Sequence, residues 1–354
     1  MHPRRAFVLA LLASRAPARA ATEPALRWPA DFGAHPESRI EWWYITGALE
    51  RPDRAWGFQI TFFRAASGIE AATASRFAAR QIVFAHAAVT DLAQRRLRHD
   101  QRIARSGFGI AEAAVGDTDL VLRDWRLKRS ERAGRSRYET AASSESGGFA
   151  FELSLDATQP VLLQGRGGIS RKGPDPEQTS RYYSEPQLAV QGSVRVDGAT
   201  AQVAGRAWLD HEWSDSILDA RAVGWDWIGM NLDDGGALTA FRLRRADGST
   251  LWSGGSHRPV GGETRDFANG EAAFVPGRTW TSPSSRAVYP VEWRVRTPAG
   301  MFRVRSLLDD QELDSRASSG AIYWEGLSVL EDEQGRRVGR GYLEMTGYAA
   351  RLVL

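Results

Sequence analysis

The densest group of chemically active side chains lies in residues 208–235, just past the middle of the chain. It contains an Asp-His-Glu-Trp run at 210–213 and a Trp-Asp-Trp run at 225–227. Carboxyl and imidazole groups donate and accept protons, and an indole ring stabilises a nearby positive charge through its π face. This stretch therefore predicts a site that binds an apolar molecule or reacts with it.

Asp226 is the candidate proton donor of that site. In an alternating strand it shares a face with Ile228 and Met230. If that face lines a cavity, desolvation raises the pKa of the Asp226 carboxyl and makes it an acid. His211 or Asp210 would then be the base that takes a proton from an attacking water. The alternative places Asp226 at a strand end, exposed or bonded to a backbone amide.

The walls of the predicted site are aromatic. We expect three tryptophans to surround the reacting groups: Trp213, Trp225 and Trp227. Further ligand-binding candidates come from three other clusters: Trp42, Trp43 and Tyr44; Tyr183; and Tyr323, Trp324 and Glu325. The alternative for these clusters is an aromatic plug that fills the inside of a barrel.

Strand geometry separates the members of the Asp-His-Glu run. Neighbouring side chains of a strand point to opposite faces, so Asp210 and Glu212 share one face and His211 takes the other. The three groups converge only if the strand bends. The run also has a structural alternative, in which its acids hold two domains together through Arg206 or Arg221.

The elements that carry these residues are predicted to be strands. Residues 41–50 alternate, a turn follows, and residues 58–64 return as the second strand of a hairpin. Short β-rich runs separated by Gly, Asp and Pro continue to the C-terminus, and residues 225–252 repeat the plan of the first hairpin. We therefore predict an all-β chain with a duplicated antiparallel barrel, because two packed barrels protect the edges of so many strands.

Length and the duplication define the expected domains. The chain has 354 residues, which is more than one hydrophobic core usually serves. We predict a signal peptide at 1–20, an irregular lead-in at 21–34, an N-terminal domain at 35–204 and a C-terminal domain at 205–354. The signal peptide is indicated by a basic start, a short apolar run and an Ala-Arg-Ala cleavage site.

Charge and composition exclude several classes of protein. The formal net charge is +3, and removal of residues 1–20 takes away four arginines and no acid, which leaves −1. A mature chain with that charge has no electrostatic basis for binding nucleic acid. The chain has no Cys, which excludes disulfides and thiolate metal ligands. No set of residues has metal-ligand spacing, so we expect neither a metal nor a cofactor.

Six motifs in order resemble one known family: HPESRIEWWYITGAL (35–49), YYSEPQL (182–188), WLDHEWS (208–214), DWIGMNLDDG (226–235), YWEGL (323–327) and GYLEMTGY (341–348). Together they are similar to the AttH / carotenoid 1,2-hydratase proteins, a lipocalin-like family that includes the CrtC-like hydroxyneurosporene synthases. The resemblance runs through nearly the whole mature chain. It implies two consecutive lipocalin-like β-barrel domains.

The same resemblance implies a function. Hydratases of the family add water to the terminal double bond of a carotenoid, and their His-x-Trp pair is matched by His211 and Trp213. Their downstream aromatic–acid pair, a Tyr and an Asp, is matched only loosely by Trp225 and Asp226, where this sequence departs from the family's pattern. Exported members are often encoded beside ABC-transporter permeases. We therefore expect a periplasmic or secreted monomer that binds a carotenoid- or lipid-like molecule, either as a hydro-lyase or as a carrier working with such a permease.

Overall fold

The computed structural model describes residues 25–69, 75, 77–216 and 218–352. The predicted signal peptide lies outside these residues. Their regular structure is β-strand apart from one turn of 3₁₀ helix, η1 (Ala30–Phe32). The prediction of an all-β chain is confirmed. Within the described residues, no helix has the length and apolar character needed to cross a membrane.

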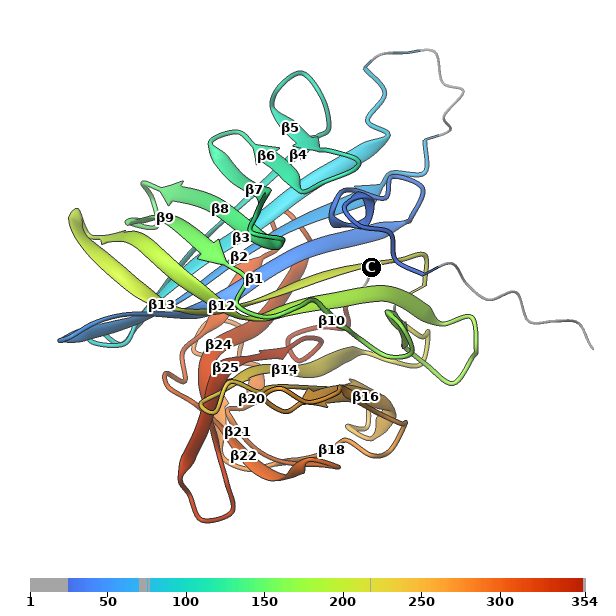
Figure 1. Ribbon diagram of the computed structural model, residues 1–354, viewed down its shortest axis with the longest axis vertical. Coiled ribbons are helices and arrows are strands. Elements are labelled where there is room, and N and C mark those ends of the chain that lie inside the picture. Colours follow the sequence, from blue (N-terminus) through green and yellow to red (C-terminus); the bar gives the residue numbers. More distant parts are fainter. Residues whose placement is uncertain (1–24, 70–74, 76, 217, 353–354) are drawn as a thin grey trace, which may run out of the picture.

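The first sheet forms the upper part of Figure 1 and has thirteen strands among the described residues, each antiparallel to its neighbours. They are β1 (Ile40–Arg51), β2 (Arg54–Ala66), β3 (Gln81–Asp91), β4 (Arg96–Arg105), β5 (Ala111–Ala113), β6 (Asp119–Leu122), β7 (Trp125–Arg132), β8 (Arg135–Ser144), β9 (Phe149–Asp156), β10 (Leu162–Leu163), β11 (Ile169–Arg171), β12 (Thr179–Val196) and β13 (Ala199–Ser214). Its main path runs β4-β3-β2-β1-β13-β12-β9-β8-β7-β6-β5. Because β3 and β4 approach β5 and β6, the sheet is a nearly closed barrel.

The second sheet forms the lower part of Figure 1 and has ten strands among the described residues. They are β14 (Gly224–Leu232), β15 (Ala237–Arg244), β16 (Thr250–Arg258), β17 (Arg265–Phe267), β18 (Ala273–Pro276), β21 (Glu292–Thr297), β22 (Gly300–Ser306), β23 (Glu312–Ser315), β24 (Ala321–Glu331) and β25 (Arg337–Met345). A separate two-stranded ribbon pairs β19 (Thr279–Thr281) with β20 (Val288–Pro290).

The two sheets repeat one strand order, as the duplicated hairpin predicts. In the first sheet a meander of four strands is followed by β13 and β12, which pair beside β1. In the second sheet the meander β17-β16-β15-β14 is followed by β25 and β24, which pair beside β14. The strands β1 and β13 therefore correspond to β14 and β25.

The first domain ends later than the sequence indicated. β13 pairs with both β1 and β12 and stays in the first sheet as far as Ser214. The second sheet begins at Gly224. The predicted boundary at residues 204/205 therefore falls inside β13, because the last strand of the first domain runs through the whole Asp-His-Glu-Trp run.

Side-chain alternation gives each sheet a core face and a seam face. Trp43 and Ile45 of β1 pack in the core of the first domain, whereas Trp42 and Tyr44 belong to a separate cluster that joins the two domains. On the second sheet, Ile228 packs in the domain core, and its neighbour Trp227 joins the same inter-domain cluster. We call the contact between these two outer faces the seam.

Candidate functional site

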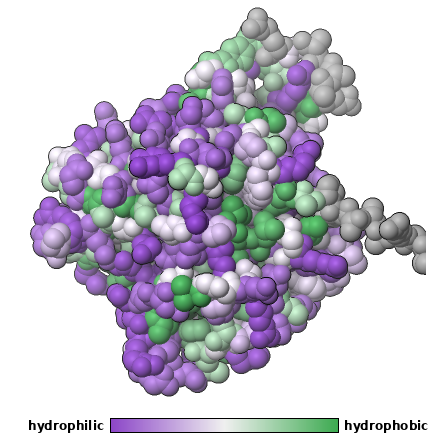
Figure 2. Space-filling model, in the orientation of Figure 1, coloured by the Kyte–Doolittle hydropathy of each residue, from purple (hydrophilic) through white to green (hydrophobic). Residues whose placement is uncertain are grey.

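A cavity of about 360 Å³ lies at the seam, outside the hydrophobic cores of both domains. Its volume falls in the range of roughly 300–1,000 Å³ that is usual for small-molecule pockets. Its polar and aromatic walls combine residues from both sheets: Trp42 and Tyr44 (β1), Tyr182 (β12), Asp210 and Glu212 (β13), Trp225 and Trp227 (β14), Phe241 (β15), Tyr323 and Glu325 (β24) and Glu344 (β25). Ile103 lines one end and is 43% exposed, so the cavity opens to solvent there. Figure 2 shows apolar side chains gathered between the upper and lower parts of the molecule.

Strand register brings the aromatic rings and the acids together. In the first sheet Trp42 lies opposite Glu212, and Tyr44 lies opposite Asp210. In the second sheet Trp227 lies opposite Glu344. Opposite residues of an antiparallel pair have adjacent side chains on one face. Each domain therefore presents an aromatic residue beside a carboxyl group to the seam.

Asp210 is a buried carboxyl group held by three donors. Ser184 donates its hydroxyl to Oδ1 at 2.5 Å, the Trp208 indole donates to the same oxygen at 2.7 Å, and Tyr182 donates to Oδ2 at 2.7 Å. Burial raises the pKa of Asp210 to about 7, although the three donors lower it. A carboxyl group poised near neutral pH can accept a proton and release it again.

Glu212, on the same face, is neutralised inside the cavity. Lys172 reaches its carboxylate with Nζ at 2.8 Å, and both side chains are buried. The ammonium group also lies 4.4 Å from the ring centre of Phe241 and 4.7 Å from that of Tyr182. The structural alternative for this run offered Arg206 or Arg221 as the partner of its acids. Arg221 pairs with Asp219 instead, and the partner of Glu212 is Lys172.

Glu325, which is buried, and Glu344, which is half-buried, form a pair of acids with no basic partner among the described residues. They lie directly opposite each other on β24 and β25. Within the described residues neither makes an ion pair, and the buried Oε1 of Glu325 has no hydrogen-bond partner. Burial, together with the neighbouring carboxyl groups, raises the pKa of Glu344 to about 7 and raises that of Glu325 well above its ordinary value. Two such groups cannot both ionise cheaply, so at least one holds a proton at neutral pH.

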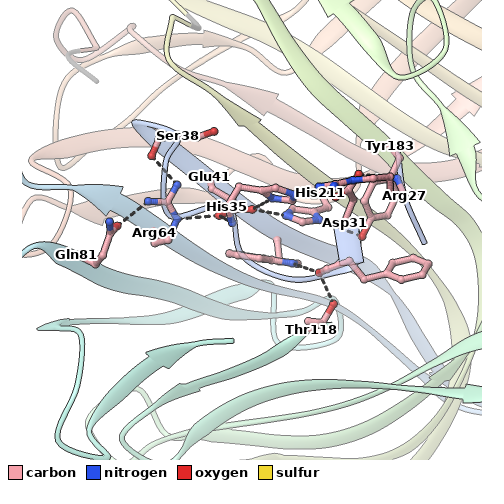
Figure 3. A network of polar contacts seen from close by, with 12 residues as sticks. Arg27, Asp31, His35, Ser38, Glu41, Arg64, Gln81, Thr118, Tyr183 and His211 are labelled. Atoms are coloured by element: carbon pink, nitrogen blue, oxygen red, sulfur yellow. Dashed lines mark hydrogen bonds and ion pairs between the residues drawn. The ribbon is translucent and has the colours of Figure 1, made fainter. Parts of the chain in front are cut away.

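His211 faces the opposite side of β13, inside the first barrel, as strand alternation predicted. Its Nε2 lies 2.8 Å from Oε1 of Glu41, and its Nδ1 lies 3.1 Å from the Tyr183 hydroxyl. His35 Nδ1 reaches the same Glu41 oxygen at 2.7 Å, and Arg64 donates Nε to the other oxygen at 2.8 Å. Figure 3 shows this network around the Glu41 carboxylate.

The three residues His35, Glu41 and His211 are close enough to hold a metal ion together, with ligand atoms within 4.8 Å of one another. Their contacts have the geometry of a hydrogen-bonded network, because two ring nitrogens approach one carboxylate oxygen and Arg64 neutralises the other. Burial raises the pKa of Glu41, but hydrogen bonds from His211 and His35 outweigh it and hold that pKa well below its usual range. We therefore assign the group to fixing the lead-in against the barrel.

Asp226 does not face the cavity. It is fully buried on the core face of β14, where Arg242 donates Nε to its Oδ2 at 2.7 Å and the Tyr348 hydroxyl donates to Oδ1 at 2.8 Å. Arg244 Nε lies 3.7 Å away. The prediction that an apolar face carries Asp226 into the cavity is wrong, since that face packs into the second domain and supplies two guanidinium groups.

The remaining aromatic candidates fall into two groups, according to which face of its strand each side chain occupies. Five predicted ligand-binding aromatics line the cavity, together with Glu325: Trp42, Tyr44, Trp225, Trp227 and Tyr323. Four others are absent from its walls and pack inside the domains: Trp43, Tyr183, Trp213 and Trp324. Trp43 stacks on the His211 ring at 4.4 Å, and Trp213 stacks on the His35 ring at 3.8 Å. These four are packed plugs of the kind stated as the alternative.

Several polar residues of the cavity were not among the predicted site residues, and the most notable are Lys172, Tyr182 and Glu344. The sequence could have predicted Glu344 through the duplication. Because β25 corresponds to β13, an acid on the outward face of β25 corresponds to the outward acids of the Asp-His-Glu run. Lys172 lies in a loop just after β11, and no periodicity predicts its direction.

Comparison with known proteins gives a consistent picture. The AttH-like family model matches residues 19–348. A crystal structure of a protein from Nitrosomonas europaea assigned to AttH is 48% identical, with a TM-score of 0.84, over 94% of this chain and 99% of that chain. Kievitone hydratase from Nectria haematococca is 16% identical, with a TM-score of 0.69, over 92% of this chain and 94% of that one. CghA shares 11% identity and a TM-score of 0.50, over 87% and 88% of the two chains. The last two likenesses show the shared fold. No curated protein matches the sequence.

Proposed function

Since the chain belongs to the AttH-like family, we propose that it binds one end of an extended apolar molecule in the seam cavity and adds water to a double bond there. The observation that carries this proposal is the juxtaposition of uncompensated buried carboxyl groups with aromatic rings in one cavity. The name of kievitone hydratase, which shares the fold, favours the same class of reaction.

The Glu325–Glu344 pair is suited to be the acid. Hydration begins when an acid transfers its proton to one carbon of the double bond, which leaves a cation on the other carbon. A carboxyl group that stays protonated near neutral pH can supply that proton. The rings of Trp42, Tyr44 and Trp227 face the same space and stabilise a desolvated positive charge, by about 2 kcal/mol in favourable cases.

Asp210 is suited to be the base. A water molecule attacks the cation through its oxygen, and the Asp210 carboxylate takes the proton that this water releases. The product is the alcohol, and the net reaction consumes one water. Asp210 lies close enough to Glu344 for their charges to interact, so a proton passed from Asp210 to Glu344 restores the starting state.

The second candidate function is that of a carrier. The seam cavity is mostly apolar and open at Ile103, which would also suit a protein that only transports its ligand. We retain with this candidate the proposals of export through residues 1–20, of a monomeric state and of work with an ABC-transporter permease. A carrier binds the ligand and leaves its mass unchanged.

The test uses the full chain with lycopene, neurosporene and kievitone as separate candidates. A product heavier by one water supports the hydratase, and Glu344→Gln should slow its formation about 10²-fold or more. Glu152→Gln, on the exposed face of β9, is the matched control and should change nothing. Binding without a mass gain in any case supports the carrier, and the absence of binding to the cavity rejects both functions.

A further inference from the structure

We propose that the part of the seam cavity around Glu325, Glu344 and Asp210 is a binding site for an organic cation, an apolar molecule that ends in an ammonium group. This inference rests on the proposed function only in that both use the same cavity. It adds the chemical class of a ligand, which the hydration of a neutral double bond does not require.

The charges of the cavity are unbalanced. Four carboxyl groups line it, from Asp210, Glu212, Glu325 and Glu344, and Lys172 is the one lysine or arginine among its described lining residues. Lys172 is bound to Glu212. Within the described residues the other three carboxyl groups have no ion-pair partner. A buried acid without a cation is costly to ionise, so a ligand that brings the positive charge is favoured.

One carboxylate oxygen among Glu325, Glu344 and Asp210 lacks a partner. Oε1 of Glu325 is buried with no hydrogen bond in the described chain. The Tyr44 hydroxyl lies beside the Glu325 carboxyl group and lowers its pKa, but burial outweighs this effect. Buried polar groups of native proteins are nearly always satisfied, by protein, water or ligand. Oε1 of Glu325 therefore marks a position for a bound group.

The cavity already holds one ammonium group of the protein itself. Lys172 places its Nζ between the Glu212 carboxylate and the rings of Tyr182 and Phe241. This is the arrangement by which aromatic sites recognise alkylammonium groups.

The duplicated half of the seam presents a second acid beside an aromatic ring. Glu344 on β25 corresponds to Asp210 on β13, because Trp227 lies opposite Glu344 as Tyr44 lies opposite Asp210. Among the described residues that line the cavity, no lysine or arginine reaches either of these two acids as Lys172 reaches Glu212. The geometry points to a ligand ammonium beside them.

The pH dependence of binding follows from the groups that face the cavity. Burial raises the pKa of Asp210 and of Glu344 to about 7, and it raises the pKa of Glu325 well above its ordinary value. A bound cation favours their ionised forms, so its affinity should rise as the pH rises through 7, with release of protons on binding. Three tyrosines and one histidine also face the cavity. Burial lowers the pKa of His86 to about 3 and raises the pKa of Tyr44, Tyr182 and Tyr323, so these four groups stay neutral over that interval. The remaining charged groups of the cavity, Glu212 and Lys172, are bound to each other.

The experiment compares two molecules of one shape, benzyltrimethylammonium and its neutral isostere neopentylbenzene. Their dissociation constants are measured on the full chain by titration calorimetry at pH 8 and pH 5.5, in two buffers of different ionisation enthalpy. We expect the ammonium compound to bind at least about tenfold more tightly at pH 8. The preference should shrink at pH 5.5, and the buffer dependence should show proton release.

The variants locate the effect. The double variant Glu325→Gln/Glu344→Gln keeps the shape of the cavity and should lose the preference for the ammonium compound while still binding neopentylbenzene. Glu152→Gln is the matched control and should retain the preference. If the double variant does not fold, the wild-type pH dependence and Tyr44→Phe, which should weaken only ammonium binding, decide the question.

The possible results separate this inference from the proposed function. Binding of neopentylbenzene as tight as that of the ammonium compound at pH 8 overturns the inference and leaves the apolar ligand site intact. A preference that survives in the double variant also overturns it. If neither molecule binds, the cavity is not the ligand site and both proposals fall.

Discussion

Replacing Asp226 with Asn separates a structural role from a catalytic one. The carboxylate is fully buried between Arg242, 2.7 Å away, and Arg244, 3.7 Å away, and it accepts a hydrogen bond from Tyr348. Asn has nearly the same shape and keeps one acceptor oxygen. It removes the negative charge, however, and leaves two buried guanidinium groups without a counter-charge.

The loss of folding stability in Asp226→Asn can be estimated from this geometry. Removing one partner of a buried ion pair typically destabilises a protein by about 3–5 kcal/mol. For a domain of this size, that loss corresponds to a fall in melting temperature of about 10–20 °C. The matched control is Asp233→Asn, which breaks the exposed pair with Arg337 at 3.0 Å in the same domain. An exposed pair contributes about 1 kcal/mol or less.

The assay is urea unfolding of both variants, with ligand binding measured under conditions in which each remains folded. We expect Asp226→Asn to lose stability and to bind the seam-cavity ligand as the wild type does, because its side chain faces away from the cavity. A variant as stable as Asp233→Asn that has lost turnover would refute this reasoning. It would return Asp226 to the role of acid that the sequence suggested.

Three further predictions follow from single contacts. Glu41→Gln places an amide N–H against a donor of the network and leaves the buried Arg64 guanidinium without its counter-charge. Urea unfolding should therefore show a loss of stability of about 3–5 kcal/mol at pH 7. That difference should shrink as the pH falls below about 4, where the unfolded Glu41 carboxyl takes up its proton. Glu344→Gln should act in the opposite direction. The raised pKa of Glu344 makes the wild type lose stability as the pH rises from about 4 to about 7, so the variant should gain relative stability at pH 8, and unchanged urea midpoints at pH 5 and 8 would contradict this. Gly229→Ala should weaken ligand binding, because its new methyl group would lie 2.3 Å from the Trp227 ring and force that ring to move. The hydrophobic core of the second domain should change little. Equal ligand affinities of the wild type and the variant in a fluorescence titration would count against this prediction.

Strand periodicity is enough to predict the fold and part of the cavity wall. The alternation of residues 41–50 and the repeated hairpin indicate two antiparallel β domains, and the two sheets repeat one strand order. The same alternation by itself separates His211 from Asp210 and Glu212. Parity within a strand is a local property, so the sequence carries it directly.

Periodicity does not tell which face of a strand meets the other domain. In a protein of two packed barrels both faces of β1 and β14 are buried, so an apolar face gives no sign of direction. The prediction for Asp226 is wrong for this reason, because Ile228 and Met230 are equally suited to a cavity wall or to a core. Asp226 on β14 pairs with Arg242 because the two residues lie opposite each other in the register of β14 and β15. The pattern of residues within one strand does not give the register between two strands.

The duplication explains why the acids collect at the seam. The corresponding strand pairs β1/β13 and β14/β25 pack with their outer faces together, since β1 contacts β25 and β13 contacts β14. Outward acids of one domain therefore meet outward acids of the other, and Asp210 and Glu212 raise the pKa of Glu344 by their charges. A structural seam would be expected to match such acids with arginines, as the exposed pair of Glu50 with Arg340 does. Within the described residues the cavity leaves Asp210, Glu325 and Glu344 without such partners, and this departure from the rest of the interface is the strongest physical reason to treat it as a site rather than as packing.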